Sequence, residues 1–356
     1  MTQETRAEQR KAFLAAAGWG RAERKLLAAD ASFRHYDRLQ GPSGSAVLMD
    51  APPDKEPVGP FLQVAEILHD MDLSAPSILA ADSKLGFVLL EDFGDRTFTQ
   101  VLGRGGDEKA LYRLALDVLI ELQRRWRPEL GISFKPYDMD TLLAEARLLV
   151  DWFLPATTGR ASSARTVESY LDAWRACLTE VSEQREVLVL RDYHVDNLML
   201  LPGRPGPAAC GLLDFQDALL GAATYDLVSL LEDARRDLGP DLAEAMLERW
   251  HQVLPERDRE ADALSYACLG AQRSAKIAGI FTRLDRRDGK SRYLAHLPRV
   301  LRLIAKDIAH PALAPVAAWF DEHLPLTEPV LPGPAPRRGV PGQPSPQPSQ
   351  LTSAQP

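Results

Sequence analysis

The chain has 356 residues, of which 45% are hydrophobic, so it is long enough for one large domain or two smaller domains with cores of their own. Its net charge of -8 and isoelectric point near 5.5 argue against nucleic acid as a partner, because phosphate-backbone binding needs a concentrated basic surface. Three scattered cysteines, a polar N-terminus and the lack of any apolar run of ~18 residues predict a cytoplasmic protein without disulfides, signal peptide or membrane contact.

The first hundred residues carry the short apolar segments of a small sheet. Apolar residues in a charged background over residues 2–27 are typical of a helix that leads into the domain. Apolar stretches at 46–49 and 86–91 have the length and flanking turn residues of strands. Between them, apolar residues recur at helical spacing over 61–71. We therefore expect a small mixed sheet that carries one helix.

From residue 107 onward the pattern is mostly helical. Apolar periodicity predicts helices over 111–122, 142–150, 167–178, 225–236, 240–253, 261–284 and 297–308. Strands are predicted to interrupt them at 187–190, 198–201 and 210–213. Residues 328–356 hold nine of the 27 prolines together with Gln, Ser and Gly, and we expect this segment to be a disordered tail outside the fold.

The loop between the first two of these strands is rich in polar residues. Phosphoryl transfer needs a carboxylate that orients the attacking hydroxyl, and oxygen ligands that hold magnesium against the phosphates. Asp192 can serve as that base, and Asn197 follows it at the five-residue spacing of kinase catalytic loops, where the Asn binds metal. His194 is a rival base, but the sequence near it offers no Ser or Cys nucleophile, so we expect a packing or phosphate-facing role.

A second carboxylate follows the third strand. A hairpin from residue 198 to residue 213 would return Asp214 beside Asn197, so the two side chains could share one cation. Asp196, in the same tight loop, could cap the turn or contact the metal. Together with the strand–loop–strand context, Asp192, Asn197 and Asp214 favour a kinase over a structural loop.

Four segments carry a resemblance to a known family. Residues 190–200 (LRDYHVDNLML), 213–221 (LDFQDALLG), 225–237 (YDLVSLLEDARRD) and 279–293 (GIFTRLDRRDGKSRY) resemble the aminoglycoside phosphotransferase family, and within it the anomeric N-acetylmuramate/N-acetylglucosamine kinases. The resemblance covers residues 27–324. It implies an α+β, two-lobed, protein-kinase-like fold: a nucleotide-binding lobe at 1–92, with a small β-sheet and one helix, and a larger, mostly helical catalytic and substrate lobe at 93–327.

The resemblance also implies an activity and roles for individual residues. The activity is ATP-dependent phosphorylation of the sugar's 1-hydroxyl in peptidoglycan recycling, with ATP and Mg2+ as cofactors and an amino sugar as the small-molecule partner. Asp192 becomes the base for the anomeric hydroxyl, and Asn197 and Asp214 become magnesium ligands. Asp226 is similar to a buried Asp that braces the catalytic loop through backbone hydrogen bonds. The segment from Glu91 to Phe93 matches the interlobe hinge, where the backbone bonds adenine. We expect a monomer.

The chain departs from the family pattern at the phosphate end of the nucleotide site. The usual catalytic-loop His is Leu190, and the strand that should end in a phosphate-binding Lys ends in Met49. Glu66, on the following helix, would then lack its usual partner. The preceding segment has no Gly-rich loop, so we expect backbone N–H groups and the Ser32 hydroxyl to cover the phosphates, with Arg34 or Arg38 supplying the positive charge.

Candidate acceptor residues come after the metal motif. Carboxylates can accept sugar hydroxyl protons, and Asp217, Glu232 and Asp233 are placed to do so; each could also be a solvated charge. The lactyl carboxylate of N-acetylmuramate needs a cation, for which the candidates are Arg235, Arg273 and Lys276. Each of the three could equally be a surface or interlobe cation.

Two other functions stay open at this point. The first is phosphorylation of an aminoglycoside or another small alcohol, although Arg235 and Arg236 lie among the acidic residues where a polycation would need a purely acidic site. The second is a nucleotide-binding pseudokinase scaffold, which Met49 and the missing glycines suggest and the intact Asp192, Asn197 and Asp214 oppose.

Overall fold

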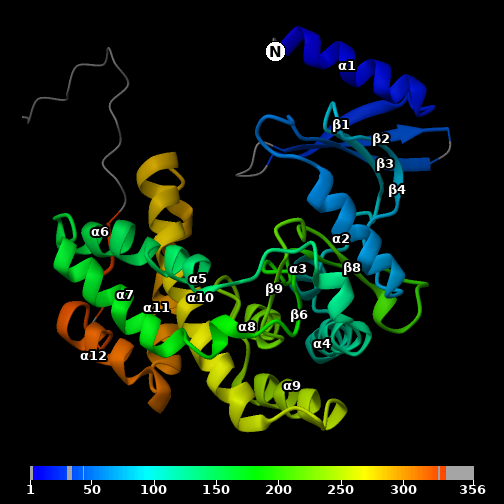
Figure 1. The fold of residues 1–356 in the computed structure, drawn as a ribbon. Helices are drawn as coiled ribbons and strands as arrows, with labels where there is room; N and C mark the ends of the chain where they lie inside the picture. The colour runs from blue at the N-terminus through cyan, green and yellow to red at the C-terminus, as the bar shows by residue number, and fades with distance from the viewer. Residues whose placement is uncertain (1–2, 30–33, 43, 328, 334–356) are drawn as a thin grey trace, which may run out of the picture.

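The computed structural model describes residues 3–29, 34–42, 44–327 and 329–333, and its N-terminal part is built on a five-stranded sheet (Figure 1). The strands are β1 (Glu23–Ala29), β2 (His35–Gly41), β3 (Gly44–Asp50), β4 (Ile78–Asp82) and β5 (Phe87–Glu91), in the spatial order β1-β2-β3-β5-β4. The strands predicted at 46–49 and 86–91 are confirmed. The predicted mixed sheet is wrong, because all four strand pairs are antiparallel.

Helices cover both faces of this sheet, α1 (Gln3–Ala16) on one and α2 (Gly59–Asp70) on the other (Figure 1). Side chains alternate across a strand, so Leu48 lies in the cluster that Phe13 of α1 joins, whereas the fully buried Met49 packs in the main core with α2. Arg6 of α1 also binds the buried carboxylate of Asp50 through its Nη2 atom, at 2.6 Å. The helix α1 therefore covers one face of the sheet.

The helix predicted over residues 2–27 is only partly correct. The helix α1 ends at Ala16, and Gly18 adopts a φ of 81°, a left-handed conformation that suits glycine and stops helices. The chain then returns as β1, the edge strand of the sheet, so residues 23–27 of the predicted helix are strand. Residues 61–71 form α2 as expected, and Glu66 is exposed on it.

The rest of the chain is mostly helical (Figure 1). Its longer helices are α3 (Phe98–Gly103), α4 (Glu108–Arg125), α5 (Met139–Ala146), α6 (Leu154–Thr158), α7 (Ala164–Leu178), α8 (Thr224–Leu231), α9 (Pro240–Val253), α10 (Arg259–Asp288), α11 (Leu297–Asp307) and α12 (Ala314–His323). The 30-residue helix α10 runs through the core of this part of the chain, with 17 of its residues buried. All seven predicted helices are present, and two of them end four or more residues earlier than predicted.

Two predicted helix ends are wrong, and both errors involve polar or irregular turns. The helix expected over 142–150 ends at Ala146 and is followed by a π-helical turn at Leu149–Phe153. The helix expected over 225–236 ends at Leu231, because Glu232 leaves helical geometry and the Oδ1 atom of Asp233 accepts a hydrogen bond from the N–H of Arg235 at 2.8 Å. Residues 232–236 therefore form a turn with inward-facing carboxylates.

Four short strands lie within the helical part, β6 (Val187–Val189), β7 (Leu198–Leu200), β8 (Cys210–Leu212) and β9 (Leu219–Gly221). The predicted hairpin is confirmed, because β7 pairs with β8 in antiparallel register, Leu198 opposite Leu212. The strand β6 pairs with β9, which the sequence did not predict. These two ribbons hold the loop that contains Asp192 and the turn that contains Asp214.

Candidate active site

The loop between β6 and β7 is held at its start by the buried carboxylate of Asp226 on α8. Its Oδ2 atom accepts a hydrogen bond from the N–H of Leu190 at 2.6 Å, and its Oδ1 atom accepts one from the N–H of Arg191 at 2.9 Å. The Ser229 hydroxyl, one turn later on α8, donates to the carbonyl of Arg191 at 3.2 Å. Burial raises the pKa of Asp226 to about 7. The hydrogen bonds expected of Asp226 are present, and they set the start of the catalytic loop.

Asp192 and Asn197 lie at the two ends of this loop and are joined across it. The Nδ2 atom of Asn197 donates to the backbone carbonyl of Asp192 at 2.9 Å, which fixes the orientation of the Asn197 amide. Asp192 itself is exposed. His194 is buried, and burial lowers its pKa, so its ring is neutral near pH 7. Its Nε2 atom lies 3.5 Å from the Nδ2 atom of Asn197, where the ring packs under the loop.

Asp214 lies beside Asn197, as the predicted hairpin requires. The N–H of Leu213 donates to the backbone carbonyl of Asn197 at 3.0 Å. The chain just before Asp214 is therefore paired with the residue that precedes β7. Asp214 then adopts a φ of 59°, a left-handed conformation that is uncommon for a residue other than glycine. Its Oδ1 atom accepts a hydrogen bond from the Nε2 atom of Gln216 at 2.9 Å. Strained backbone at a ligand site is typical of functional turns.

A cavity of about 350 Å³ opens between the N-terminal sheet and the β7–β8 hairpin. Apolar side chains from both sides line it, among them Val47, Leu90 and Met199. Asn197 and Asp214 lie on its wall, so the cavity holds both metal-ligand candidates as well as an apolar slot. Such a combination of apolar walls and a few convergent polar groups is typical of a ligand site.

The hinge residues Glu91 and Phe93 border this cavity, as predicted from the resemblance. The Glu91 carboxylate is bonded to Arg204 and to the hydroxyl of Ser77, at 3.0 Å for the latter, so its side chain belongs to a polar network. The Phe93 ring packs on Gly211 of β8, where an added Cβ would lie 2.7 Å from the ring. The side chains of Glu91 and Phe93 are therefore both fixed by contacts within the protein.

Arg34 lies near Asp214, next to the 350 Å³ cavity that Asp214 lines. Its Nη2 atom is 3.8 Å from the Oδ1 atom of Asp214, and its Nε atom is 2.6 Å from the Oε2 atom of Glu56. Its side chain is 12% exposed and lines a second cavity of about 230 Å³ together with Met49 and Lys55. A guanidinium therefore lies near the position where Met49 replaces the expected lysine.

Arg38, the alternative phosphate cation, is committed elsewhere. Its Nε atom lies 2.8 Å from Asp92, and its Nη1 atom lies 2.7 Å from Asp95, so it ties β2 to the segment that follows the hinge. Arg38 is thus paired with two carboxylates, and its predicted role as the cation for the phosphates stays a prediction. Ser32 lies outside the described residues.

The predicted acceptor carboxylates divide into one exposed and two buried groups. Asp217 is exposed on the turn after Asp214 and lines the 230 Å³ cavity. Glu232 is buried and bonded to the Nζ atom of Lys306 at 2.6 Å. Asp233 is buried as well, and its Oδ2 atom has no hydrogen-bond partner among the described residues. Asp233 faces His194, because its charge opposes the lowering of that histidine's pKa.

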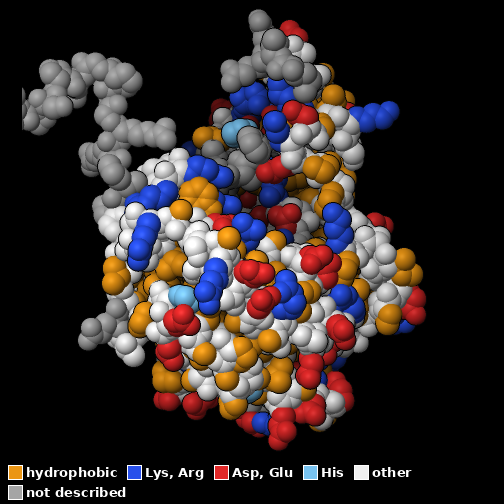
Figure 2. Space-filling view, turned by 60° about the vertical axis from the view of Figure 1, so that its left-hand side comes forward, with side chains coloured by type: hydrophobic (Ala, Val, Ile, Leu, Met, Phe, Trp, Pro, Cys, Tyr) orange, Lys and Arg blue, Asp and Glu red, His pale blue; other side chains and the backbone are white. Residues whose placement is uncertain are grey.

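The predicted cations lie around the same loop. Arg235 approaches the Nε2 atom of His194 to 3.5 Å and the Oδ2 atom of Asp196 to 3.9 Å. Arg273 is buried on α10, and its charge contributes to the low pKa of His194. Lys276, one turn later, bonds Glu145 at 2.9 Å. Figure 2 shows basic and acidic side chains interspersed over the visible face, without a continuous patch of one sign.

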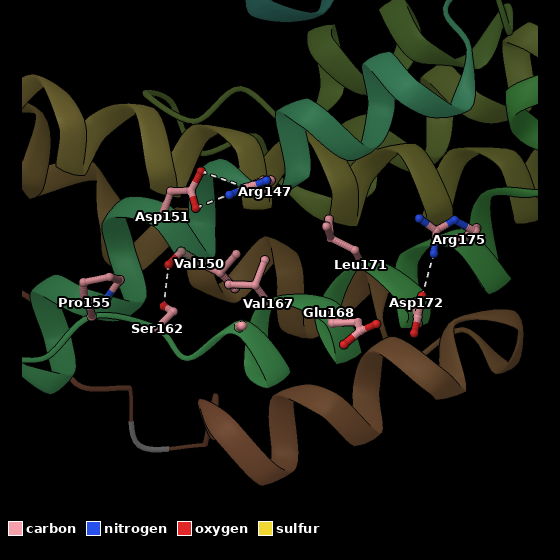
Figure 3. Close-up of a pocket in the computed structure, with 12 residues that line it drawn as sticks. Arg147, Val150, Asp151, Pro155, Ser162, Val167, Glu168, Leu171, Asp172 and Arg175 are labelled. Carbon is pink, nitrogen blue, oxygen red and sulfur yellow. Dashed lines mark hydrogen bonds and ion pairs between the residues drawn. The ribbon is translucent and has the colours of Figure 1, made fainter.

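Another hollow, of about 740 Å³, lies away from these residues along α7 (Figure 3). Its charged side chains pair with one another, Arg147 with Asp151 at 3.2 Å and Arg175 with Asp172 at 2.5 Å. It contains none of the residues that the sequence singled out. Its size alone therefore does not make it the active site.

Comparisons with known proteins agree with this geometry. The sequence profile of the phosphotransferase enzyme family matches residues 23–263. The chain belongs to this family. It is 35% identical to the N-acetylmuramate/N-acetylglucosamine kinase of Caulobacter vibrioides over 92% of this chain and 99% of that protein. It is 39% identical to the kinase of the same name from Neisseria meningitidis serogroup B, over 83% of this chain and 89% of that protein.

Solved structures show the same fold at low sequence identity. ADP-bound aminoglycoside phosphotransferase APH(2'')-Ib superposes with a TM-score of 0.57 at 16% identity, over 86% of this chain and 99% of that one. A choline/ethanolamine kinase family protein from Mesorhizobium loti gives 0.57 at 13% identity, over 88% and 98%. The predicted two-lobed, protein-kinase-like α+β fold and the predicted class, an ATP-dependent phosphotransferase, are confirmed. None of the helices within the described residues is long and apolar enough to span a membrane.

Proposed function

We propose that this phosphotransferase phosphorylates the anomeric 1-hydroxyl of N-acetylmuramate and N-acetylglucosamine, using ATP and Mg2+, and that the sugar 1-phosphate feeds peptidoglycan recycling. The observation that carries the proposal is that Asn197 and Asp214 meet on the wall of the 350 Å³ cavity, with Asp192 joined to Asn197 through its backbone carbonyl. The names of the relatives, at 34–39% identity, support the choice of sugars. We assign residues 1–92 to the nucleotide and residues 93–327 to catalysis and the acceptor.

In this proposal Asp192 is the general base. Its exposed carboxylate is free to face an incoming hydroxyl, and the bonds from Asp226 to the two residues before it keep the loop still. It accepts the proton of the sugar hydroxyl while that oxygen forms its bond to the γ-phosphorus and the bond from phosphorus to the ADP oxygen breaks. The role of Asp192 therefore depends on its fixed position.

The donor set fits magnesium. One carboxylate, that of Asp214, and one amide oxygen, that of Asn197, meet on one cavity wall, and Mg2+ is commonly bound by one or two protein oxygens plus substrate phosphates. The Asn197 amide already donates its N–H to Asp192, which leaves its Oδ1 atom to accept a cation. When bound, the ion would neutralise charge on the phosphates. The protein holds these two oxygens in place through the β7–β8 hairpin.

We place the adenine in the apolar slot against the backbone of the hinge between Glu91 and Phe93. The phosphates would then extend toward Asn197 and Asp214, where Arg34, with Ser32, supplies donors in place of a lysine. For the acceptor, Asp217, Glu232 and Asp233 are the proposed hydroxyl partners. The proposed cations for the lactyl carboxylate are Arg235, Arg273 and Lys276. Mixed charge on this side suits a neutral or anionic sugar.

The test is phosphorus NMR of purified protein mixed with ATP, magnesium and each sugar in turn. We expect an acid-labile sugar 1-phosphate from both sugars, and none from the Asp192→Asn variant, which controls for contaminating kinases. Phosphate on another hydroxyl, or on an aminoglycoside alone, would replace the proposal with the general small-alcohol kinase. Absence of ATP turnover with every acceptor would favour the pseudokinase scaffold.

A further inference from the structure

A buried carboxylate on α5, Glu145, lies at the centre of a charged cluster beneath the catalytic loop. Its Oε1 atom bonds the guanidinium of Arg191 and the Nζ atom of Lys276, the latter at 2.9 Å. Its Oε2 atom accepts hydrogen bonds from the hydroxyl of Tyr137 and from the Nε2 atom of Gln272 at 3.5 Å. The side chain is 11% exposed. Both oxygens are therefore engaged, and the cluster joins α5 and α10 to the catalytic loop.

Arg191 is the residue immediately before the proposed base. Its φ is 71°, in the left-handed region that arginine seldom adopts, so the surrounding structure must hold it there. Asp226 binds its N–H, Ser229 binds its carbonyl, and Glu145 binds its guanidinium. The backbone angles of Arg191 set the direction in which the chain enters Asp192. A displacement of the Arg191 side chain would therefore also displace the base.

The same guanidinium also reaches the metal-side turn. Its Nη1 atom donates to the backbone carbonyl of Asp217 at 3.3 Å, three residues after Asp214. It lies over the Tyr137 ring, 5.6 Å from the ring centroid, a cation–π contact that fixes its plane. One arginine side chain thus links the loop of the base to the turn that follows the metal ligand, and Glu145 is its counter-ion.

Glu145 is ionised in this cluster. Burial alone would raise its pKa, but Lys276 and Arg191 outweigh burial and hold the pKa of Glu145 below its usual range. Without the negative charge, the two cations would face each other in a half-buried site with no counter-charge between them. The guanidinium would then move toward solvent, and the left-handed conformation of Arg191 would lose one of its supports.

We propose that Glu145 is a positioning residue for the phosphoryl transfer, acting through Arg191 to aim Asp192 and to hold the Asp217 turn beside it. This inference rests on the proposed function, because it takes Asp192 as the base. Glu145 lies below the loop among protein groups, and its role does not require contact with sugar or nucleotide. Its loss is therefore expected to lower turnover and to leave in place the affinity for N-acetylglucosamine, which has no lactyl carboxylate for Lys276 to bind.

The test compares Glu145→Gln with wild type on both sugars. Glutamine keeps the size of the side chain and can still accept from Tyr137, but it cannot form the ion pair. We expect kcat to fall roughly 10- to 100-fold for both sugars, which is the usual range for residues that orient a reacting group. The KM for N-acetylglucosamine should be unchanged. Asp140→Asn, an exposed acid on the same helix, is the matched control and should match wild type.

A double-mutant cycle separates positioning from general loss of structure. If Glu145 acts through Arg191, Glu145→Gln combined with Arg191→Gln should be no slower than Arg191→Gln alone. Additive losses in kcat would overturn the inference, as would wild-type kcat in Glu145→Gln. A rise in the KM of one sugar with unchanged kcat would also overturn it, by making Glu145 a substrate-binding residue.

A second readout needs no sugar and therefore stands if the proposed function fails. Hydrogen exchange of peptides covering residues 187–198 should be faster in Glu145→Gln, because the N–H of Arg191 loses protection, and unchanged in Asp140→Asn. Wild type that is inactive on both sugars would refute the proposed function, while the exchange result would still decide the positioning role. Unchanged exchange at 187–198 would refute the positioning role in either case.

Discussion

The guanidinium of Arg34 lies 3.8 Å from the carboxylate of Asp214, although the two residues are 180 positions apart in the chain. This contact brings a cation to the metal end of the nucleotide cavity, where the family pattern would place a lysine. Met49 cannot supply that charge, because its thioether is neutral, and its side chain is fully buried with α2. We propose that Arg34, the residue immediately before the second strand, supplies the charge instead.

Replacing Arg34 with alanine should therefore weaken the handling of phosphate. We expect a higher KM for ATP and a kcat lower by roughly 10²-fold, the range seen when one preorganised donor to a developing charge is removed. Arg34→Lys should recover part of the activity, since it keeps the charge and loses the bidentate geometry. The measurement is steady-state kinetics at saturating sugar over a series of ATP concentrations.

Arg24→Ala is the matched control for this variant. Arg24 lies on the neighbouring strand β1, is more exposed, and pairs with Asp37 on β2 at 3.6 Å, away from the cavity. Its removal should leave both constants unchanged. If Arg34→Ala behaves like Arg24→Ala, the assignment of Arg34 to the phosphates is wrong.

Asp192→Asn should lower kcat by roughly 10²- to 10⁴-fold, the usual cost of removing a general base. The substitution keeps the shape of the side chain, and the backbone carbonyl that Asn197 bonds stays in place, so the melting temperature should hold. Asp72→Asn is a fair comparison, because that exposed aspartate has a φ of 53° and asparagine tolerates this conformation. Turnover of Asp192→Asn within a few-fold of wild type would remove Asp192 from the mechanism.

Asp214→Asn should raise the magnesium concentration needed for half-maximal activity, or abolish activity. Asparagine is the informative substitution because Asp214 has a φ of 59°, where alanine would add backbone strain to the loss of charge. Its carbonyl can still accept the hydrogen bond from Gln216. The check is a magnesium titration at fixed, saturating ATP. A titration curve identical to that of wild type would exclude Asp214 as a ligand.

The parts of this site that could be predicted from the sequence are local. Asp192 and Asn197 are five residues apart, and Asp214 is brought back by a short hairpin, so spacing and strand pattern are enough to place them. Helix faces follow from apolar periodicity, which is why the helix over 240–253 is found with its exact ends. Short-range geometry leaves little freedom once the strands are recognised.

The parts that could not be predicted depend on contacts between distant segments. Glu145 and Arg191 are 46 residues apart, and a single acid between apolar helix positions has the pattern of a solvated charge. The early end of the helix at Leu231 goes with contacts that no periodicity reveals, between Glu232 and Lys306 and between Asp233 and the N–H of Arg235. The strand β1 was not predicted, because the side chains of residues 23–27 are exposed and give no alternating pattern.

The last prediction concerns the buried pair of carboxylates at Glu232 and Asp307. Both lie over Gly270 of α10, where an added Cβ would be 2.3 Å from the Oδ2 atom of Asp307 and 3.0 Å from the Oε2 atom of Glu232. Burial, together with the charge of Glu232, raises the pKa of Asp307 to about 9. Lys306 bonds Glu232 at 2.6 Å and lies 3.6 Å from Asp307, so it offsets only part of the repulsion.

The sign of the effect on stability follows from proton linkage. A carboxyl with a pKa near 9 in the folded protein and about 4 in the unfolded chain takes up a proton on folding at any pH between these values, so stability falls as pH rises through that window. Asp307→Asn removes this titration while keeping a neutral side chain of the same shape. As pH rises from 5 to 9, the free energy of unfolding of the variant should therefore rise relative to that of wild type, by at most about 1.4 kcal/mol per pH unit.

Urea unfolding at pH 5 and at pH 9 measures this difference directly. Asp321→Asn, an exposed aspartate on α12, should change stability little and equally at both pH values. For Asp307→Asn, the gap from wild type must widen in favour of the variant at pH 9, because only wild type has to bury a second negative charge there. A gap that is the same at both pH values would mean that Asp307 is already ionised at pH 5 and that Lys306 stabilises both carboxylates.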